Sequence, residues 1–307
     1  MRRAAGRDVV GTFVGFERSG SMNYEEQAIT FDCHGASLYG IASVPQQSGA
    51  RGVLIVVGGP QYRVGSHRQF ALLARSLASQ GIPAMRFDYR GMGDSVGEPR
   101  TFEEVGPDLR AAIDHFIVTV PGMQEVVIWG LCDAAAAALF YGAEDARVCG
   151  LVLLNPWVRT SGGHAKATLK HYYLERLLQP ALWRKIVSGR FNYRGALRSL
   201  ASVAGAAAKP AATGSGVGHA AAADAPLPDR MLAGLANFKG KVLLILSGRD
   251  LTAREFSDLA KGSAKWQRLL GASRVTRHAL DEADHTFSRR VWRDQVSTWT
   301  GDWIKSW

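Results

Sequence analysis

The alternation of short apolar runs with helical stretches is the feature that most constrains the fold of this chain. The runs at 52–57, 125–129, 149–154 and 241–246 are almost continuously apolar, as expected for strands that are buried on both faces of a sheet. Helical patterns occur at 66–79, 102–118, 133–141, 255–270 and 287–307, and further strand patterns at 28–33, 37–44, 83–87 and 274–280. This order predicts an α/β fold in which a mostly parallel central sheet has helices on both faces.

The strand–helix pattern is interrupted after Asn155 and Pro156. A basic, aromatic, helical segment runs to about residue 200, and 201–228 is rich in Ala and Gly with few large apolar side chains, a composition typical of linkers. We therefore expect an α/β core made of 1–156 and 239–307. The intervening 157–238 would form a basic helical cap with an Ala/Gly-rich linker, inserted where it covers the strand ends.

The formal net charge of +10 is concentrated in the expected cap, because nine basic residues and one acidic residue lie between 157 and 200. A basic patch raises the local concentration of anionic partners. We therefore expect Arg184, Lys185 and Arg190 to contact an anionic substrate. No recognisable nucleic-acid-binding module accompanies the patch, so nucleic acid is not expected. Two alternatives stay open: a solvated basic face, and an interfacial helix at 172–187 in peripheral contact with an anionic membrane.

The cysteines indicate a reducing compartment. Cys33, Cys132 and Cys149 form neither a paired disulfide framework nor a metal-ligand spacing, so we interpret them as reduced thiols in a cytoplasmic protein. No apolar run approaches the roughly 18 residues that span a bilayer, and we expect no secretory signal. Nothing in the sequence indicates a metal or an organic cofactor.

A candidate nucleophile stands at the turn that follows the 125–129 strand. The turn 130–134 reads Gly-Leu-Cys-Asp-Ala and opens an alanine-rich helix. A nucleophile on such a sharp bend needs small neighbours, which Gly130 and Ala134 supply. The unpaired N–H groups at the start of the helix favour a thiolate over a thiol. The alternative is that Cys132 is a small buried hydrophobe, the commoner role of a lone cysteine.

Two downstream residues favour the catalytic interpretation of Cys132. Asp250 follows the 241–246 strand, and His285 follows the last predicted strand. His285 would take the thiol proton and later activate water. Asp250 would hold the correct imidazole tautomer and stabilise its charged form. Other candidates for the acid are Asp258, Asp281 and Asp284.

An oxyanion hole would require two backbone N–H groups aimed at the developing negative charge. We expect one from Asp133, the residue after the nucleophile. The other should come from the loop after the 52–57 strand, which continues Gly58-Gly59-Pro60-Gln61. Because proline has no N–H, Gly59 is the preferred donor and Gln61 the reserve.

These motifs together resemble the α/β-hydrolase superfamily over nearly the whole chain. The loop at 88–95, Asp-Tyr-Arg-Gly-Met-Gly-Asp-Ser, looks like the superfamily's Asp-x-Arg-Gly-x-Gly-x-Ser loop. More narrowly, 58–68 and 129–135 are similar to the first of the hydrolases associated with the bacterial exosortase A system, which accompany exopolysaccharide production. The cysteine in place of serine departs from the superfamily, a replacement also found in dienelactone hydrolases.

The resemblance implies a hydrolase or an acyltransferase. Our leading interpretation is hydrolysis of an ester or thioester through an acyl-Cys132 intermediate, with transfer to another acceptor as a close variant. The basic cap favours an anionic acyl donor, such as a coenzyme A or acyl-carrier-protein thioester. A non-catalytic α/β-hydrolase-like binding protein is the remaining alternative, and it would leave Cys132 no more reactive than Cys33 or Cys149.

Overall fold

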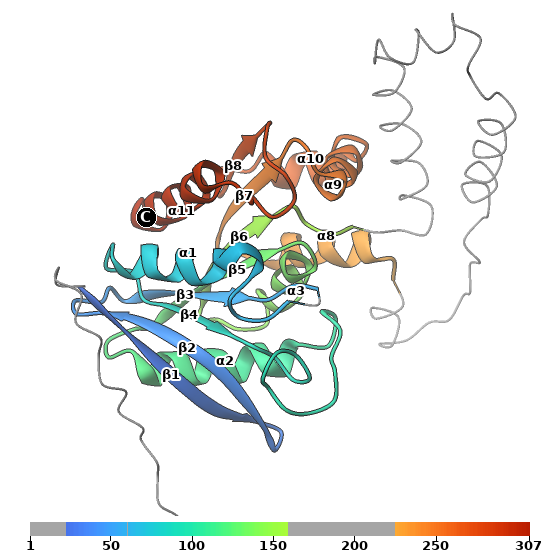
Figure 1. The fold of residues 1–307 in the computed structure, drawn as a ribbon. Helices are drawn as coiled ribbons and strands as arrows, with labels where there is room; N and C mark the ends of the chain where they lie inside the picture. The colour runs from blue at the N-terminus through green and yellow to red at the C-terminus, as the bar shows by residue number, and fades with distance from the viewer. Residues whose placement is uncertain (1–22, 60, 159–224) are drawn as a thin grey trace, which may run out of the picture.

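A mostly parallel sheet forms the centre of the protein in a computed structural model that describes residues 23–59, 61–158 and 225–307 (Figure 1). Its eight strands lie in the order β1-β2-β4-β3-β5-β6-β7-β8. They are β1 (Tyr24–Cys33), β2 (Ala36–Pro45), β3 (Arg51–Val56), β4 (Ala84–Phe87), β5 (Glu125–Leu131), β6 (Val148–Leu154), β7 (Lys241–Ser247) and β8 (Val275–Leu280). β2 pairs antiparallel with β1 and β4, and the other neighbouring pairs are parallel.

Helices cover both faces of this sheet, as the sequence predicted. They are the short 3-10 helix η1 (Ser66–Arg68) and the α-helices α1 (Gln69–Ala78), α2 (Gly106–Thr119), α3 (Asp133–Tyr141), α8 (Leu227–Asn237), α9 (Leu251–Lys261), α10 (Ala264–Leu270) and α11 (Arg290–Lys305). α1 and α11 pack together on one face, and α2 lies on the other (Figure 1). From α2, contacts continue through α3, α8 and α10 to α9.

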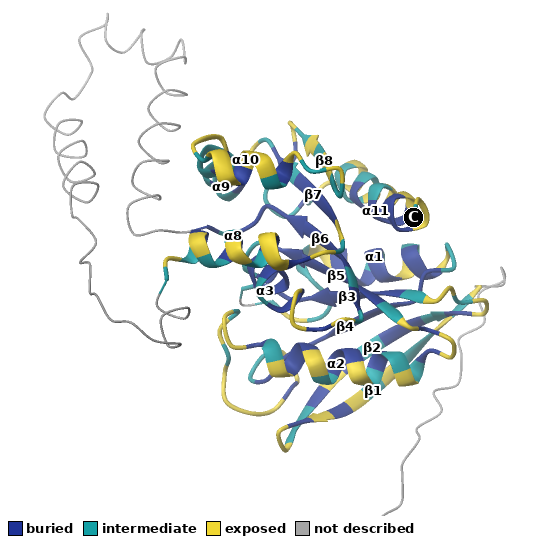
Figure 2. Ribbon diagram, turned by 180° about the vertical axis from the view of Figure 1, so that it is seen from behind, coloured by how far each residue is buried: buried dark blue, intermediate teal, exposed yellow. Residues whose placement is uncertain are grey.

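The apolar runs that predicted the central strands form the core. Leu54 in β3, Ile128 in β5 and Leu243 in β7 have no exposed surface. Figure 2 shows buried residues along the strands and exposed residues on the outer sides of the helices. Each such side chain contributes roughly 1.5–3 kcal/mol when it leaves water, so these runs both place the strands and stabilise the sheet.

Three predicted helices differ from those observed. The stretch predicted at 66–79 is η1 followed by α1, with left-handed backbone at His67 and Arg68. The stretch predicted as one helix at 255–270 is α9 followed by α10. The chain breaks at Gly262, and the Ser263 hydroxyl then accepts the Trp266 N–H at the start of α10. The helix predicted at 102–118 begins at Gly106 instead. Capping groups and proline decide these boundaries, whereas apolar periodicity runs across them.

The C-terminal part of the expected cap is described as α8, and it packs with the core helices. α8 lies against α3, where Met231 and Leu235 are buried. Gly234 approaches α3 so closely that a Cβ there would lie 2.2 Å from the carbonyl oxygen of Leu139. The rest of the expected cap lies outside the described residues, so the cap and its linker stay predictions.

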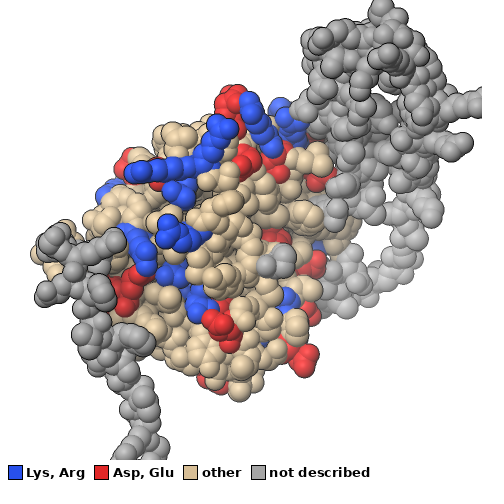
Figure 3. All heavy atoms as spheres, viewed as in Figure 1, with Lys and Arg blue, Asp and Glu red and all other residues tan. Residues whose placement is uncertain are grey.

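Basic and acidic side chains are mixed on the face of the protein drawn in Figure 3. Several form exposed pairs, such as Arg75 with Glu26 and Arg147 with Asp114, each at 2.6 Å. Pairs of this kind contribute about 0–1 kcal/mol each to stability. The predicted anion-binding residues Arg184, Lys185 and Arg190 lie outside the described residues. In the described part of the chain, no helix has both the length and the apolar character needed to cross a membrane.

Candidate active site

Cys132 lies on a sharp bend between β5 and α3. Its backbone has φ 65° and ψ −122°, a left-handed conformation that costs a non-glycine residue of order 1–3 kcal/mol. The bend tolerates only small neighbours, because a Cβ on Gly130 would lie 2.5 Å from the carbonyl oxygen of Ala134. The Cys132 N–H donates to the carbonyl of Leu154 at 2.9 Å, which ties the bend to the end of β6. The thiol is therefore held at the carboxyl edge of the sheet.

The structure brings Asp250 and His285 together at the same edge. Asp250 is the N-cap of α9 and accepts the Thr252 and Ala253 N–H groups. Its Oδ2 also lies 2.9 Å from Nδ1 of His285. Among the four candidate acids, all of which are described, Asp250 is the one recorded in a hydrogen bond with this ring. The carboxylate is thus fixed by the helix start and in turn fixes the imidazole.

The same imidazole lines one cavity with Cys132 and lies close enough for the sulfur to raise the pKa of the ring. Since Nδ1 faces Asp250, the ring nitrogen left for the sulfur is Nε2. Burial by itself lowers the pKa of His285, but the hydrogen bonds with Asp250 and Cys132 and their negative charges outweigh burial and raise the pKa to about 10. The arrangement therefore favours an imidazolium at His285.

Asn155 links the loops that follow β6, β7 and β8. It was not among the site residues predicted from the sequence. It is fully buried and has φ 42°. Its Nδ2 donates to the carbonyl of His285 at 3.0 Å, and its Oδ1 accepts the Ser247 N–H at 2.9 Å. The adjoining chain binds the nucleophile turn, since the Trp157 N–H donates to the Cys132 carbonyl at 3.2 Å. The signal in the sequence was an asparagine directly after a buried strand, which a turn would also explain.

The predicted oxyanion donors have an unexpected arrangement. The N–H of Gly59 donates to the side-chain carboxylate of Asp133 at 2.9 Å, and the other oxygen of that carboxylate accepts the Ala134 N–H at 3.0 Å. Desolvation raises the pKa of Asp133, although these hydrogen bonds and His285 act against the rise. We expected Asp133 to contribute only its backbone. Instead, its side chain occupies the N–H that was expected to bind the substrate oxygen.

A cavity of about 350 Å³ opens onto the sulfur of Cys132. It combines the polar groups of the site with aromatic and aliphatic surface, and its lining consists of Gly58, Gly59, Gln61, Phe70, Phe102, Leu131, Cys132, Asp133, Trp157 and His285. A mostly apolar cavity with a few convergent polar groups is typical of a small-molecule site. Nothing in the described part of the chain gathers three or more His, Cys, Asp or Glu side chains in a way that could hold a metal ion.

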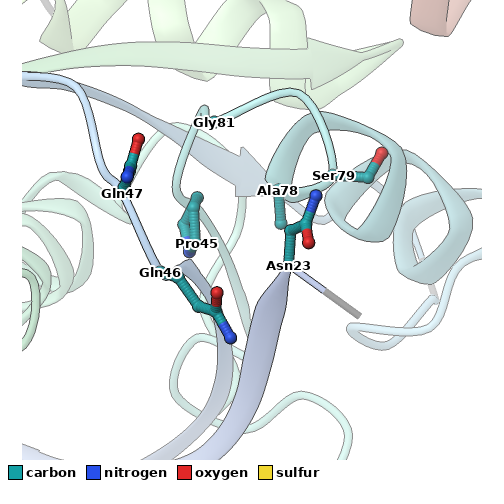
Figure 4. Close-up of a pocket in the computed structure, with 7 residues that line it drawn as sticks. All are labelled: Asn23, Pro45, Gln46, Gln47, Ala78, Ser79 and Gly81. Carbon is teal, nitrogen blue, oxygen red and sulfur yellow. The ribbon is translucent and has the colours of Figure 1, made fainter. Parts of the chain in front are cut away.

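A second hollow, of about 460 Å³, lies at the amino ends of the parallel strands, away from Cys132 (Figure 4). It is formed around the ends of β2 and α1 and is lined by Asn23, Pro45, Gln46, Gln47, Ala78, Ser79 and Gly81. These residues offer amides and one hydroxyl, but no thiol, imidazole or carboxylate. The cavity at Cys132 is therefore the better candidate for chemistry.

Known proteins similar to this chain agree with the geometry at the level of fold and family. The polyketide transferase claH of Penicillium crustosum is 27% identical over 144 residues, which are 45% of this chain and 46% of that protein. The polyketide transferase grgF of a Penicillium species is 29% identical over 98 residues, or 29% of this chain and 32% of that protein. The chain thus spans about half or less of the length of the curated relatives it matches.

Solved structures extend the likeness of fold to almost the whole chain. The esterase Pf2001 of Pyrococcus furiosus has a TM-score of 0.61 at 17% identity, with 96% of this chain and 98% of that chain covered. Residues 49–288 match the family described as serine aminopeptidase, S33, although here a cysteine stands at the bend after β5. Because this match covers more than half of the chain, the protein belongs to the serine aminopeptidase S33 family and has the α/β-hydrolase fold.

Proposed function

We propose that this enzyme hydrolyses an ester or thioester through a Cys132–His285–Asp250 triad and a covalent acyl-cysteine. The observation that carries the proposal is the position of one imidazole, which is hydrogen-bonded to the Asp250 carboxylate and lies beside Cys132 in the same cavity. That arrangement meets the requirement for an activated nucleophile, namely a base within hydrogen-bond reach and a third group that orients the base.

In the first half of the reaction, the Cys132 thiolate attacks the carbonyl carbon of the substrate. The new C–S bond forms as the π electrons of the carbonyl move onto its oxygen, which becomes an oxyanion. When the oxyanion collapses, the bond to the leaving alkoxide or thiolate breaks. The leaving group takes the proton of the His285 imidazolium.

In the second half, water attacks the acyl-cysteine and gives a proton to the now neutral His285. Collapse of this second oxyanion expels the Cys132 thiolate and releases the carboxylic acid. The imidazolium–thiolate pair is then restored, and Asp250 stabilises its positive partner through both halves.

Transfer to an acceptor other than water is the second candidate function. It is supported by the likeness to claH and grgF, which are named polyketide transferases. An acyl-cysteine is itself an activated thioester, so an alcohol, amine or thiol in the cavity would compete with water. The balance between hydrolysis and transfer depends on how well the cavity excludes water.

The expected cap supplies the proposed substrate class. We infer an anionic donor, a coenzyme A or acyl-carrier-protein thioester, from the basic residues Arg184, Lys185 and Arg190. Charge reversal at these positions should raise KM with little change in kcat, because uniform binding is lost. Normal binding of such donors by the variants at low salt would contradict this assignment.

The cellular setting follows from the sequence features. Reduced thiols at all three cysteines favour a cytoplasmic location, and the likeness of 58–68 and 129–135 to the first exosortase A-associated hydrolase favours a link to exopolysaccharide systems. Peripheral contact with an anionic membrane is the alternative role for the basic segment. Flotation with liposomes that contain or lack anionic lipid separates this role from donor binding.

The test of the triad is a panel of p-nitrophenyl acyl esters and acyl-coenzyme A thioesters with wild type and Cys132→Ala. Wild type should accumulate an acyl adduct visible by intact mass, and Cys132→Ala should lose both adduct and turnover. Cys149→Ala is the matched control, since burial raises the pKa of the Cys149 thiol to about 11 and leaves it unreactive. Undiminished turnover in Cys132→Ala would overturn the proposal.

A further inference from the structure

An oxyanion at Cys132 needs two hydrogen-bond donors, and the backbone N–H expected from the loop after β3 already has another partner. The Gly59 N–H donates a hydrogen bond to the Asp133 carboxylate at 2.9 Å. The proline at position 60 has no N–H. The side chain of Gln61 lines the same cavity as Cys132 and His285. We propose that the side-chain amide of Gln61 donates to the oxyanion, beside the backbone N–H of Asp133. This inference rests on the proposed acyl transfer.

The Gln61 amide is held through its oxygen. Oε1 accepts the backbone N–H of Ser66 at 3.2 Å, so the two N–H bonds of Nε2 remain for another acceptor. Within the described residues, Nε2 donates to no protein acceptor. The supporting turn is itself fixed, because the Gly65 N–H donates to the Tyr62 carbonyl at 2.8 Å and the Phe70 N–H to the Val64 carbonyl at 3.1 Å.

The Asp133 carboxylate fits closely against the loop after β3. Releasing the Gly59 N–H so that it could bind the oxyanion would therefore cost free energy. Its two oxygens accept the N–H groups of Gly59 and Ala134. The close fit is possible because position 58 is glycine, where a Cβ would lie 2.3 Å from Oδ1 of Asp133. Moving the carboxylate to free the Gly59 N–H would leave the Ala134 N–H without its partner. A neutral amide donor in the same cavity lining avoids this cost.

The test compares Gln61→Met and Gln61→Glu with wild type on a p-nitrophenyl acyl ester. Methionine matches the length of glutamine without donors, and glutamate keeps an acceptor for Ser66 without the donating amide. Both variants should lose about 10²–10³-fold in kcat with a smaller change in KM, the usual effect of one oxyanion donor. Gln46→Met, an exposed position that lines the distant hollow of Figure 4, is the matched control and should keep wild-type turnover.

Carbamidomethylation of Cys132 by iodoacetamide separates this role from damage to the site. Displacement of iodide requires the thiolate but forms no oxyanion, so both Gln61 variants should react at the wild-type rate, within about twofold. A parallel fall in labelling and turnover, or turnover within about threefold of wild type, would overturn the role of Gln61. Failure of the proposed function itself looks different: Cys132 in wild type would then show no preferential labelling, and Cys132→Ala would keep its turnover.

Discussion

In the proposed triad, His285 is the residue that links the acid to the nucleophile. Its ring is one-third exposed, with a side-chain exposure of 34%, whereas that of Asp250 is 8%. Burial works against the charge on His285, yet the pKa of the ring is raised from 6.5 to about 10 because Asp250 and Cys132 bind the charged form. The imidazolium should therefore persist through neutral pH.

Replacement of Asp250 by asparagine should remove the main group that raises the pKa of His285. With a lower pKa the ring loses its proton near neutrality, the thiolate loses its partner, and both turnover and iodoacetamide labelling of Cys132 at about pH 6.5 should fall. We expect a loss of about 10²–10⁴-fold in kcat, as for acids of this kind that are changed to amides. Stopped-flow turnover and quantitative mass spectrometry measure the two effects.

The same substitution should change the pH dependence of stability. A group whose pKa is higher in the folded state stabilises the fold fully below its unfolded pKa, and this contribution is lost as pH rises through the folded pKa. For His285 the window lies between 6.5 and about 10. The fall in the free energy of unfolding across this window should be shallower in Asp250→Asn than in wild type; equal slopes would show that the pair contributes nothing.

At the scale of elements, the site is a meeting of loops at the carboxyl ends of β5, β6, β7 and β8. Asn155, directly after β6, links two of its neighbours through one side chain. Its Nδ2 donates to the carbonyl of His285, and its Oδ1 accepts the N–H of Ser247, three residues before Asp250. Asn155 is therefore a positioning residue for both partners of the thiol.

Asn155→Gly should reduce turnover by about 10–100-fold with KM nearly unchanged, because a small displacement of the imidazole is costly. Glycine tolerates the positive φ of this position, so the change removes the two side-chain hydrogen bonds without backbone strain. The pH profile of Cys132 labelling should shift with turnover, which a purely structural defect in a folded protein would not cause. Asn237→Gly, at the exposed end of α8, is the control; equal effects of the two changes would rule out a positioning role.

For the molecule as a whole, a buried ion pair fastens the loop after β4 to α2. Arg90 donates to both oxygens of Asp108 at 2.9 and 2.8 Å, and its own backbone N–H donates to the same carboxylate at 2.9 Å. Asp108 has no exposed surface. The pair joins the loop that resembles the superfamily's Asp-x-Arg-Gly-x-Gly-x-Ser motif to the helical layer, so it supports the fold and not the reaction.

Asp108→Ala should destabilise the protein by about 3–5 kcal/mol, since it leaves the Arg90 guanidinium buried without its partner. Asp114→Ala on the same helix is the matched control. Asp114 is exposed and pairs with Arg147 at the surface, so its removal should cost about 1 kcal/mol or less. Urea denaturation monitored by tryptophan fluorescence measures both. Similar midpoints for the two variants would contradict the buried pair's role.

Much of the architecture could be predicted from the sequence because it depends on local pattern. Continuous apolar runs placed the central strands, and the alanine-rich stretch placed α3 at its observed bounds. The break between α9 and α10 was missed because apolar periodicity continues across Gly262 and Ser263. The packing of α8 on α3 was not predicted. An apolar helix face in the sequence does not indicate which element it will contact.

The sequence by itself determined the order of strands and helices along the chain and the small-residue bend at Cys132, since each is set by residues close in sequence. Only the tertiary structure decided which polar groups pair. Gly59 and Asp133 are 74 residues apart, and Asn155 and His285 are 130 apart. Such pairings depend on how strands lie beside one another, because a hydrogen bond requires atoms about 3 Å apart and correctly aligned.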